Sequence, residues 1–260
     1  MRILTIGDVC SPDGVKALLC TLPKIKREFS ADLCIVNGEN SALGNGITPE
    51  SAMDIFAAGA HVITGGNHSL RRKEIYPLLE ENPFLLRPHN IEGEAGSGYC
   101  LVDLGRTNAA IINLSGQIYL DSRISASNPF TCADSLIERA KAEGAKNIIV
   151  DFHAEATSEK RALGFYLDGR VTALFGTHTH VQTSDAQILP KGTGYITDLG
   201  MTGAVRSVLG IRPEQSVETF LGGLPGRYQT AGGACKLQGA IFELDSDTGL
   251  CVGVERIDIR

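Results

Sequence analysis

The sequence predicts an α/β protein in which a layered sheet of parallel strands packs against helices. Over the first 80 residues, short apolar runs alternate with amphipathic stretches in the order β-α-β-α-β, which is typical of a parallel sheet. The chain has 260 residues, of which 43% are hydrophobic and 21% charged, so it can bury a sizeable core. No internal repeat or low-complexity linker interrupts it, and we expect residues 1–260 to form a single domain.

The first half of the predicted sheet comes from three apolar runs, each followed by a helical pattern. The expected elements are a strand over 3–9, a helix over 15–29, a strand over 33–36, a helix from residue 49, a strand over 62–64 and a helix over 71–81. In the first helix, apolar side chains recur about every 3.6 residues and form one buried face. Pro23 lies within this pattern, and because proline removes a backbone hydrogen bond, we expect it to kink or shorten the helix.

The second half is richer in strands. The expected elements are strands over 99–104 and 109–114 around a turn at 105–108, a strand over 148–152, a helix from about residue 158, a strand over 173–175, and strands over 240–244 and 252–257 around a turn at 245–249. Between them, residues 205–235 are rich in Gly and contain three Arg. We interpret this segment as a long excursion with one helix over 213–221. It is a lid, a subunit contact or plain surface, and we slightly favour a subunit contact in a homo-oligomer.

Polar side chains follow five of the expected strands at the point where each apolar run ends. They are Asp8, Glu39 with Asn40, Asn67 with His68, His153, and His178 with His180. In open α/β sheets, functional groups collect beyond the carboxyl ends of the strands, so these side chains could surround one crevice. Asp8 alone could be a helix cap and Asn40 alone a turn residue, but such alternatives would require a coincidence at five strand ends.

These eight residues offer two carboxylates, two amides and four imidazoles. This mixture suits Mn, Fe, Zn or Ni better than Ca or Mg. Eight candidates are too many for one tetrahedral zinc, but they suit two metals roughly 3.5–4 Å apart that share a bridging carboxylate. In an extended strand His178 and His180 would point to opposite sides, whereas a turn could direct one towards each metal.

The same segments resemble the calcineurin-like metallophosphoesterases. That superfamily carries D-x-H, G-D-x-x-D/E, G-N-H-D/E, a distant His and G-H-x-H in that order. Here the corresponding segments are GD at 7–8, GEN at 38–40, GNH at 66–68, His153 and GTHTH at 176–180. The segments GENSALGNGIT, GGNH, RPHN, DFHAEATSEK, GTHTHVQT and TDLGMTG resemble more closely the YmdB-like bacterial phosphodiesterases, over nearly the whole chain. This resemblance implies a metallophosphoesterase-type layered sandwich, with two mixed β-sheets flanked by α-helices.

The resemblance also implies a role for each residue. The metal ligands would be Asp8, Asn40 and His180 for a first ion, Asn67, His153 and His178 for a second, and Glu39 for both. His68 would donate a proton or orient the phosphate, and a hydroxide that bridges the metals would attack phosphorus in line. The cofactors would be two divalent or trivalent transition-metal ions, with Fe or Mn favoured and Zn as the alternative.

Two positions depart from the superfamily pattern. Cys10 replaces the His of D-x-H, and in the YmdB-like subgroup Asn40 takes over that role. Since a Cys after a strand is usually a small buried hydrophobe, we favour that interpretation of Cys10, and a thiolate ligand is the alternative. Ser69 replaces the acidic residue that follows G-N-H, so the partner that orients His68 is left open.

Several other polar residues have an ordinary structural interpretation. We place His61 and His89 outside the ligand set, because a lone His is more often a satisfied core or surface residue. Glu155 and Glu159 are interpreted as charges near a helix N-terminus, which the helix dipole favours. Lys160 is expected to be a solvated helix charge, with a contact to phosphate as the alternative.

Composition limits the partners and the compartment. Lys plus Arg number 24 against 30 for Asp plus Glu, and a net charge of −6 argues against a broad basic face for nucleic acid. Extended RNA is kept only as a weak possibility, and two metal ions would supply positive charge at one place. Seven Cys without a C-x-x-C pair and the lack of a signal-peptide pattern predict a cytoplasmic protein. No segment approaches the ~18 apolar residues of a membrane span.

We therefore expect a dinuclear-metal phosphodiesterase that hydrolyses small phosphodiesters. The resemblance points to 2′,3′- or 3′,5′-cyclic nucleotides as substrates. One alternative is a phosphomonoesterase or nucleotidase with the same site, and another is a non-catalytic metal-binding regulatory protein. The extra imidazole of His68 argues against the regulatory alternative, because metals that only hold a fold do not need it.

Overall fold

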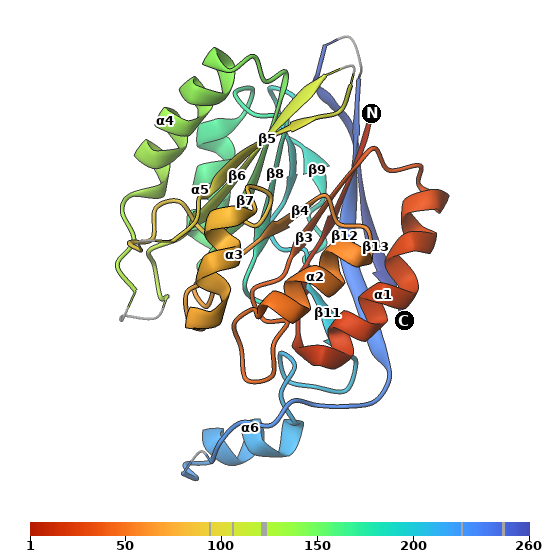
Figure 1. The fold of residues 1–260 in the computed structure, drawn as a ribbon, viewed down its shortest axis with the longest axis vertical. Helices are drawn as coiled ribbons and strands as arrows, with labels where there is room; N and C mark the ends of the chain where they lie inside the picture. Colours follow the sequence, from red (N-terminus) through yellow and green to blue (C-terminus); the bar gives the residue numbers. More distant parts are fainter. Residues whose placement is uncertain (94, 106, 121–123, 225, 246–247) are drawn as a thin grey trace.

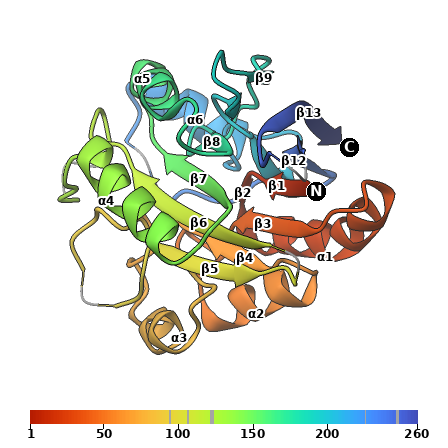
Figure 2. The same ribbon diagram turned by 90° about the horizontal axis from the view of Figure 1, so that it is seen from above.

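The chain folds into two β-sheets that lie face to face between two layers of helices (Figure 1, Figure 2). The computed structural model describes residues 1–93, 95–105, 107–120, 124–224, 226–245 and 248–260. The predicted α/β class and the implied sandwich of two mixed sheets are both confirmed.

The first sheet joins the N-terminal strands to the C-terminal hairpin. It contains β1 (Arg2–Ile6), β2 (Asp8–Val9), β3 (Leu33–Asn37), β4 (Val62–Thr64), β11 (Met201–Ala204), β12 (Cys235–Leu244) and β13 (Cys251–Ile259). Their order is β2-β11-β12-β1-β3-β4, with β13 beside β12. β1, β3 and β4 run parallel, whereas β12 runs antiparallel to β1. The carboxyl ends of β1, β3 and β4 therefore reach the same edge.

The second sheet has a parallel centre and antiparallel edges. It contains β5 (Tyr99–Asp103), β6 (Asn108–Ser115), β7 (Asn147–His153), β8 (Ala173–Thr177), β9 (Gln187–Ile188) and β10 (Gly194–Ile196), in the order β5-β6-β7-β8-β10-β9. β6, β7, β8 and β10 are parallel, and β5 and β9 pair antiparallel at the two edges. The carboxyl ends of β7 and β8 lie next to each other.

Helices cover the outer face of each sheet (Figure 2). They are α1 (Ser11–Glu28), α2 (Pro49–Ala57), η1 (Lys73–Ile75), α3 (Tyr76–Glu81), α4 (Pro129–Ala142), α5 (Thr157–Leu167) and α6 (Pro213–Phe220). Apolar side chains of α1, α2 and α3 pack on the first sheet, and those of α4 and α5 pack on the second. α6 belongs to neither layer and projects from one end of the molecule (Figure 1). In the described part of the chain, no helix is both long and apolar enough to cross a membrane.

Alternating side chains of the central strands build three hydrophobic layers. In β1, Leu4 packs towards the first helical layer, while its neighbour Ile3 packs between the two sheets. In β6, Ile111 packs between the sheets and Ile112 packs towards the second helical layer. Successive side chains of a strand point to opposite faces, so a strand that is covered on both sides must be apolar throughout. This explains the continuous apolar runs in the sequence.

Two expectations about local structure need correction, and a third is not tested. Pro23 does not shorten α1, which continues to Glu28, because Leu22 and Ile25 on either side of it are buried against the first sheet. The expected helix over 71–81 is divided into η1 and α3, with Pro77 in the first turn of α3, where proline is tolerated. The two expected turns at 105–108 and 245–249 include residues 106 and 246–247, which lie outside the described residues.

Some elements were not predicted at all. α4 carries a readable signal, because Asn128 caps it by accepting hydrogen bonds from the N–H groups of Phe130 and Thr131, and Pro129 occupies its first turn. β9, β10 and β11 have two to four residues each, which is too short for any hydrophobic period to be visible.

Candidate active site

The structure brings all eight predicted site residues to one end of the sandwich. Asp8 lies in β2, and Glu39 with Asn40 and Asn67 with His68 follow β3 and β4 in the first sheet. His153 ends β7, and His178 with His180 follow β8 in the second sheet. The carboxyl ends of parallel strands from both sheets therefore meet at this site, as the sequence pattern predicts.

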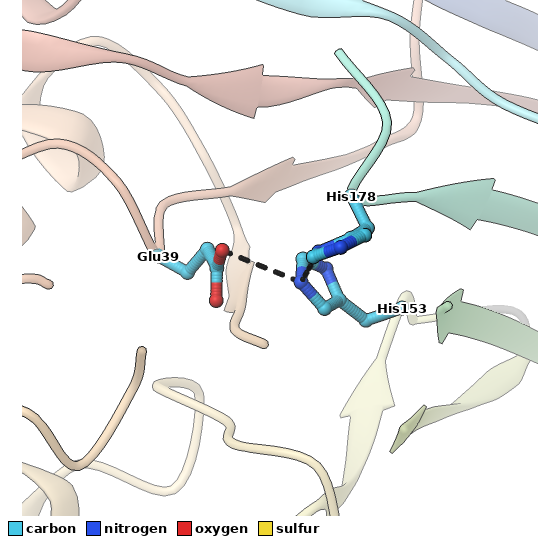
Figure 3. A group of neighbouring side chains, drawn as sticks. All are labelled: Glu39, His153 and His178. Carbon is cyan, nitrogen blue, oxygen red and sulfur yellow. Dashed lines mark hydrogen bonds and ion pairs between the residues drawn. The ribbon is translucent and has the colours of Figure 1, made fainter. Parts of the chain in front are cut away.

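One group of possible metal ligands surrounds Nε2 of His153 (Figure 3). This nitrogen lies 2.9 Å from Oδ1 of Asn67, 3.0 Å from Nδ1 of His178 and 3.3 Å from Oε1 of Glu39. Ligand atoms about 2.1 Å from one metal lie about 3 Å apart when they bind at right angles. The spacing of these four atoms fits a metal ion.

A second group of possible ligands also adjoins Glu39. Oδ1 of Asp8 is 3.6 Å from Nε2 of His180, and Nδ2 of Asn40 donates a hydrogen bond to Oε1 of Glu39 at 2.7 Å. Among the described residues, Oδ1 of Asp8 and Oδ1 of Asn40 are buried side-chain oxygens without a hydrogen-bond partner. Buried acceptors are rarely left unsatisfied, and a cation would satisfy both. The residues therefore fit a pair of metal ions, with Glu39 between the two groups.

The protonation states of Glu39 and His178 suit metal ligands, whereas the pKa of His153 is raised, because the neighbouring Glu39 and Asp8 outweigh the effect of burial. Burial raises the pKa of Glu39, but the neighbouring His153 and His68 lower it more, so this pKa lies well below its ordinary value. Burial and the neighbouring His153 lower the pKa of His178 to about 3. At neutral pH, Glu39 is therefore a carboxylate and His178 a neutral imidazole, which are the forms that bind a metal.

The backbone of the loop after β8 directs both of its histidines into the site. His178 has φ of +100° and His180 has φ of +62°, which are uncommon conformations for residues other than Gly. As a result, Nδ1 of His178 reaches His153 while Nε2 of His180 reaches Asp8. The close approach also needs Gly66, since a Cβ atom there would lie 2.2 Å from both Glu39 and His153.

His68 is held beside the metal ligands but is partly open to solvent. Its side chain is 21% exposed, and its Nδ1 lies 3.3 Å from Oε1 of Glu39, whose Oε2 accepts the N–H of His68 at 2.9 Å. Glu39 is therefore the orienting partner that the sequence left open. Ser69 instead accepts the N–H of Gly66 at 2.8 Å and stabilises the turn.

A cavity of about 270 Å³ opens over these side chains. Its lining includes His68, His178 and His180, together with Cys10, Glu155 and residues 209–211. Sγ of Cys10 lies 3.5 Å from Nδ1 of His180, so Cys10 faces the site, and its contact with a metal stays an open alternative. Glu155 lies 3.1 Å from Nε2 of His178. We had interpreted Glu155 only as a charge near a helix N-terminus, so this contact with the site was not expected.

The base of the 205–235 excursion forms one wall of this cavity. The carbonyl oxygen of Leu209 lies 3.1 Å from Nδ1 of His180. Further out, α6 and the residues that follow it expose several large apolar side chains, with Phe220 at 88% and Leu224 at 94% exposed. The predicted subunit contact stays a prediction.

The two histidines outside the predicted ligand set do not line the cavity. His61 accepts the N–H of Cys34, and His89 is exposed.

The interpretation of Lys160 as a solvated charge is wrong. Its side chain is 1% exposed, and its Nζ donates to Oδ2 of Asp198 at 2.7 Å and to the carbonyl oxygen of Thr177 at 2.8 Å. The same Asp198 oxygen accepts the N–H of Thr179 at 3.2 Å. This buried pair therefore holds the backbone on both sides of His178.

A buried polar network below the possible metal ligands was not predicted from the sequence. It centres on Asp151 of β7, whose Oδ1 accepts a hydrogen bond from Thr177 at 2.7 Å and whose Oδ2 accepts from Asn37 at 3.1 Å and from Thr64. Burial raises the pKa of Asp151 to about 6, although these hydrogen bonds act in the opposite direction. The network joins β3 and β4 of the first sheet to β7 and β8 of the second, directly beneath the site.

The fold and the arrangement of these side chains are of the metallophosphoesterase type. Two mixed sheets carry carboxylate, amide and imidazole groups at their strand ends, and three of the imidazoles line the cavity. Residues 4–257 match the model of the YmdB-like protein family, and the chain belongs to that family.

Known proteins agree with this assignment. A 2′,3′-cyclic-nucleotide 2′-phosphodiesterase of Bacillus subtilis is 44% identical over 100% of this chain and 97% of its own length. The crystal structure of a phosphatase from Mycoplasma pneumoniae is 35% identical, with a TM-score of 0.93 over 100% of this chain and 93% of that one. The NAD nucleotidase of Haemophilus influenzae is 16% identical, with a TM-score of 0.59 over 99% of this chain and 55% of that one, which shows a shared fold. The chain is an enzyme of the phosphodiesterase and phosphatase class.

Proposed function

We propose that this protein is a dinuclear-metal phosphodiesterase that hydrolyses 2′,3′-cyclic nucleotides, with 3′,5′-cyclic nucleotides as the second candidate. The observation that carries the proposal is the convergence of seven possible metal ligands and the imidazole of His68 at one end of the sandwich, beside a cavity that His68 and four of these ligands line. The full-length similarity to a 2′,3′-cyclic-nucleotide 2′-phosphodiesterase supports this choice of substrate. Three imidazoles among carboxylate and amide oxygens favour Fe or Mn, with Zn as the alternative.

Two metal ions, when bound, would supply an activated water and would neutralise charge on the phosphate. The side chains of the protein have separate tasks. Asp8 and Asn40 would hold one ion with His180, and Asn67, His153 and His178 would hold the other. Glu39, which contacts both groups, would bridge the two ions.

His68 is the group placed to move a proton. When one phosphoester bond of a cyclic nucleotide breaks, the ribose oxygen leaves as an alkoxide and needs a proton. His68 lines the cavity, Oε1 of Glu39 faces its Nδ1, and Nδ2 of Asn67 lies 3.4 Å from its Nε2. Imidazole is the side chain best suited to giving and taking a proton near neutral pH.

A larger cavity of about 600 Å³ is lined by Asn67 but not by His68. Arg71 and Lys73 are among the residues that line it. It contains none of the proposed acid or base groups, so we place the reacting phosphate in the smaller cavity. The cationic lining of the larger one could accept a more distant part of the substrate.

Replacing His68 with Ala is expected to lower kcat on 2′,3′-cyclic AMP by about 10²–10⁴-fold, because the leaving oxygen loses its proton donor. His89→Ala is the matched control, since His89 is an exposed imidazole outside the cavity. The assay compares metal-loaded proteins on 2′,3′-cyclic AMP, 3′,5′-cyclic AMP and a p-nitrophenyl monoester. A monoester cleaved faster than both cyclic diesters would favour the phosphomonoesterase alternative. A full rate for His68→Ala on every substrate would contradict the assigned role.

A further inference from the structure

We propose that Thr177 is a positioning residue of the metal site, because its hydroxyl keeps the proton of His153 on Nδ1 and so leaves the lone pair of Nε2 for a metal ion. This inference rests on the metal site of the proposed function. It assigns a task to a side chain that is itself no ligand. Three hydrogen-bond relations in the buried network carry it.

The hydrogen of the Thr177 hydroxyl is already committed to Asp151. Asp151 is fully buried, and donors face both of its oxygens, with Thr177 on Oδ1 and Asn37 and Thr64 on Oδ2. The carboxylate can therefore act only as an acceptor here. A hydroxyl has one hydrogen, so the Thr177 hydroxyl can only accept from any further partner.

That further partner is His153. Its Nδ1 lies 2.9 Å from Oγ1 of Thr177, and because this oxygen can only accept, Nδ1 must carry a hydrogen. In a neutral imidazole the other nitrogen then carries a lone pair. The tautomer of His153 is fixed from below the site, through a chain that runs from Asp151 to Thr177 to His153.

Nε2 faces two other possible ligand atoms. Oδ1 of Asn67 is 2.9 Å away and Oε1 of Glu39 is 3.3 Å away, and both atoms are acceptors. A metal ion that takes the place of a proton on Nε2 would be shared by all three atoms, so a hydrogen held on Nδ1 reserves Nε2 for the metal. Groups that orient a ligating His in this way typically contribute 10–100-fold to metal affinity.

Three variants separate this role from a general structural one. Thr177→Val keeps the shape and the backbone bond to Lys160 but removes the hydroxyl, whereas Thr177→Ser keeps the hydroxyl. Thr64→Val is the matched control, because it removes another hydroxyl bond to the same Asp151 without touching His153. Each metal-depleted protein is titrated with Mn²⁺ in competition with a chelating dye.

We expect Thr177→Val to bind Mn²⁺ about 10–100-fold more weakly at one of two sites, while Thr177→Ser and Thr64→Val stay within about threefold of the parent. Equal Mn²⁺ affinity in Thr177→Val and the parent would overturn the inference. ¹⁵N NMR of the unaltered protein loaded with diamagnetic Zn²⁺ is a second measurement that needs no variant. We expect a protonated Nδ1 on His153, and a metal-bound Nδ1 would overturn the inference as well.

Neither measurement uses turnover, so the two proposals can fail separately. A parent protein that binds two Mn²⁺ ions but leaves cyclic nucleotides intact would contradict the substrate and leave the role of Thr177 in place. Normal turnover of cyclic nucleotides by the parent, with unchanged Mn²⁺ affinity in Thr177→Val, would contradict the role of Thr177 alone.

Discussion

Replacing Glu39 with Gln is expected to abolish binding of at least one metal ion and to lower phosphodiesterase activity by roughly a thousandfold or more. The Glu39 side chain is 1% exposed, and its two oxygens face different donors. Oε1 accepts from Nδ2 of Asn40, and Oε2 accepts from the N–H of His68. In Gln one of the two oxygens becomes an NH₂ group, and in either orientation this group would face one of these donors. The negative charge that both metals would share would also be lost.

Metal content and activity of Glu39→Gln are compared with those of Asp168→Asn. Asp168 is also a buried carboxylate that accepts backbone N–H groups, from Lys191 and Thr193, but it lies outside the site. The control should therefore lose stability without losing metal. Two tightly bound metals in purified Glu39→Gln would show that this carboxylate does not bridge them.

Replacing Lys160 with Met is expected to lower the free energy of unfolding by about 3–5 kcal/mol, because Asp198 is left as a buried charge without its partner. Both side chains are 1% exposed, and Nζ of Lys160 lies 2.7 Å from Oδ2 of Asp198. The loop that carries His178 should also loosen, since Nζ no longer holds the carbonyl oxygen of Thr177. Urea unfolding of the metal-depleted proteins measures the stability directly.

Two further variants show whether the burial of the charge on Asp198 causes this loss of stability. In Lys160→Met/Asp198→Asn neither side chain is charged, so the double variant should be more stable than Lys160→Met alone. Lys141→Met removes an exposed pair with Glu138, 2.9 Å apart, and should cost about 0–1 kcal/mol. A loss below about 1 kcal/mol in Lys160→Met as well would contradict the structural importance of the buried pair.

The parts of the site that follow strands could be predicted from the sequence. A strand buried on both faces forms a continuous apolar run, and its end is visible where a polar residue such as Asn67 or His153 follows. Because parallel strands end at one edge, the convergence of these residues also follows from the order of elements. Among the elements that were not predicted, β9 to β11 are too short to show a period.

Most of the residues that support the site could not be predicted from local sequence patterns. Lys160 stands in an ordinary helical segment, and its partner Asp198 is far away in the sequence, so no local pattern reveals that it is buried. The wall formed by Leu209 depends likewise on tertiary folding. Asp151 did leave a signal, because a carboxylate inside the apolar run 148–152 must have hydrogen-bond partners in the core.

Anomalous X-ray scattering from crystals of the purified protein, collected at the Fe, Mn and Zn edges, tests the dinuclear site most directly. We expect two peaks roughly 3.5–4 Å apart, one beside Asp8 and His180 and one beside Asn67 and His153, with the Glu39 carboxylate between them. The edge energies would identify the metals. A single peak, or peaks remote from Glu39 in crystals of active protein, would contradict this account of the site.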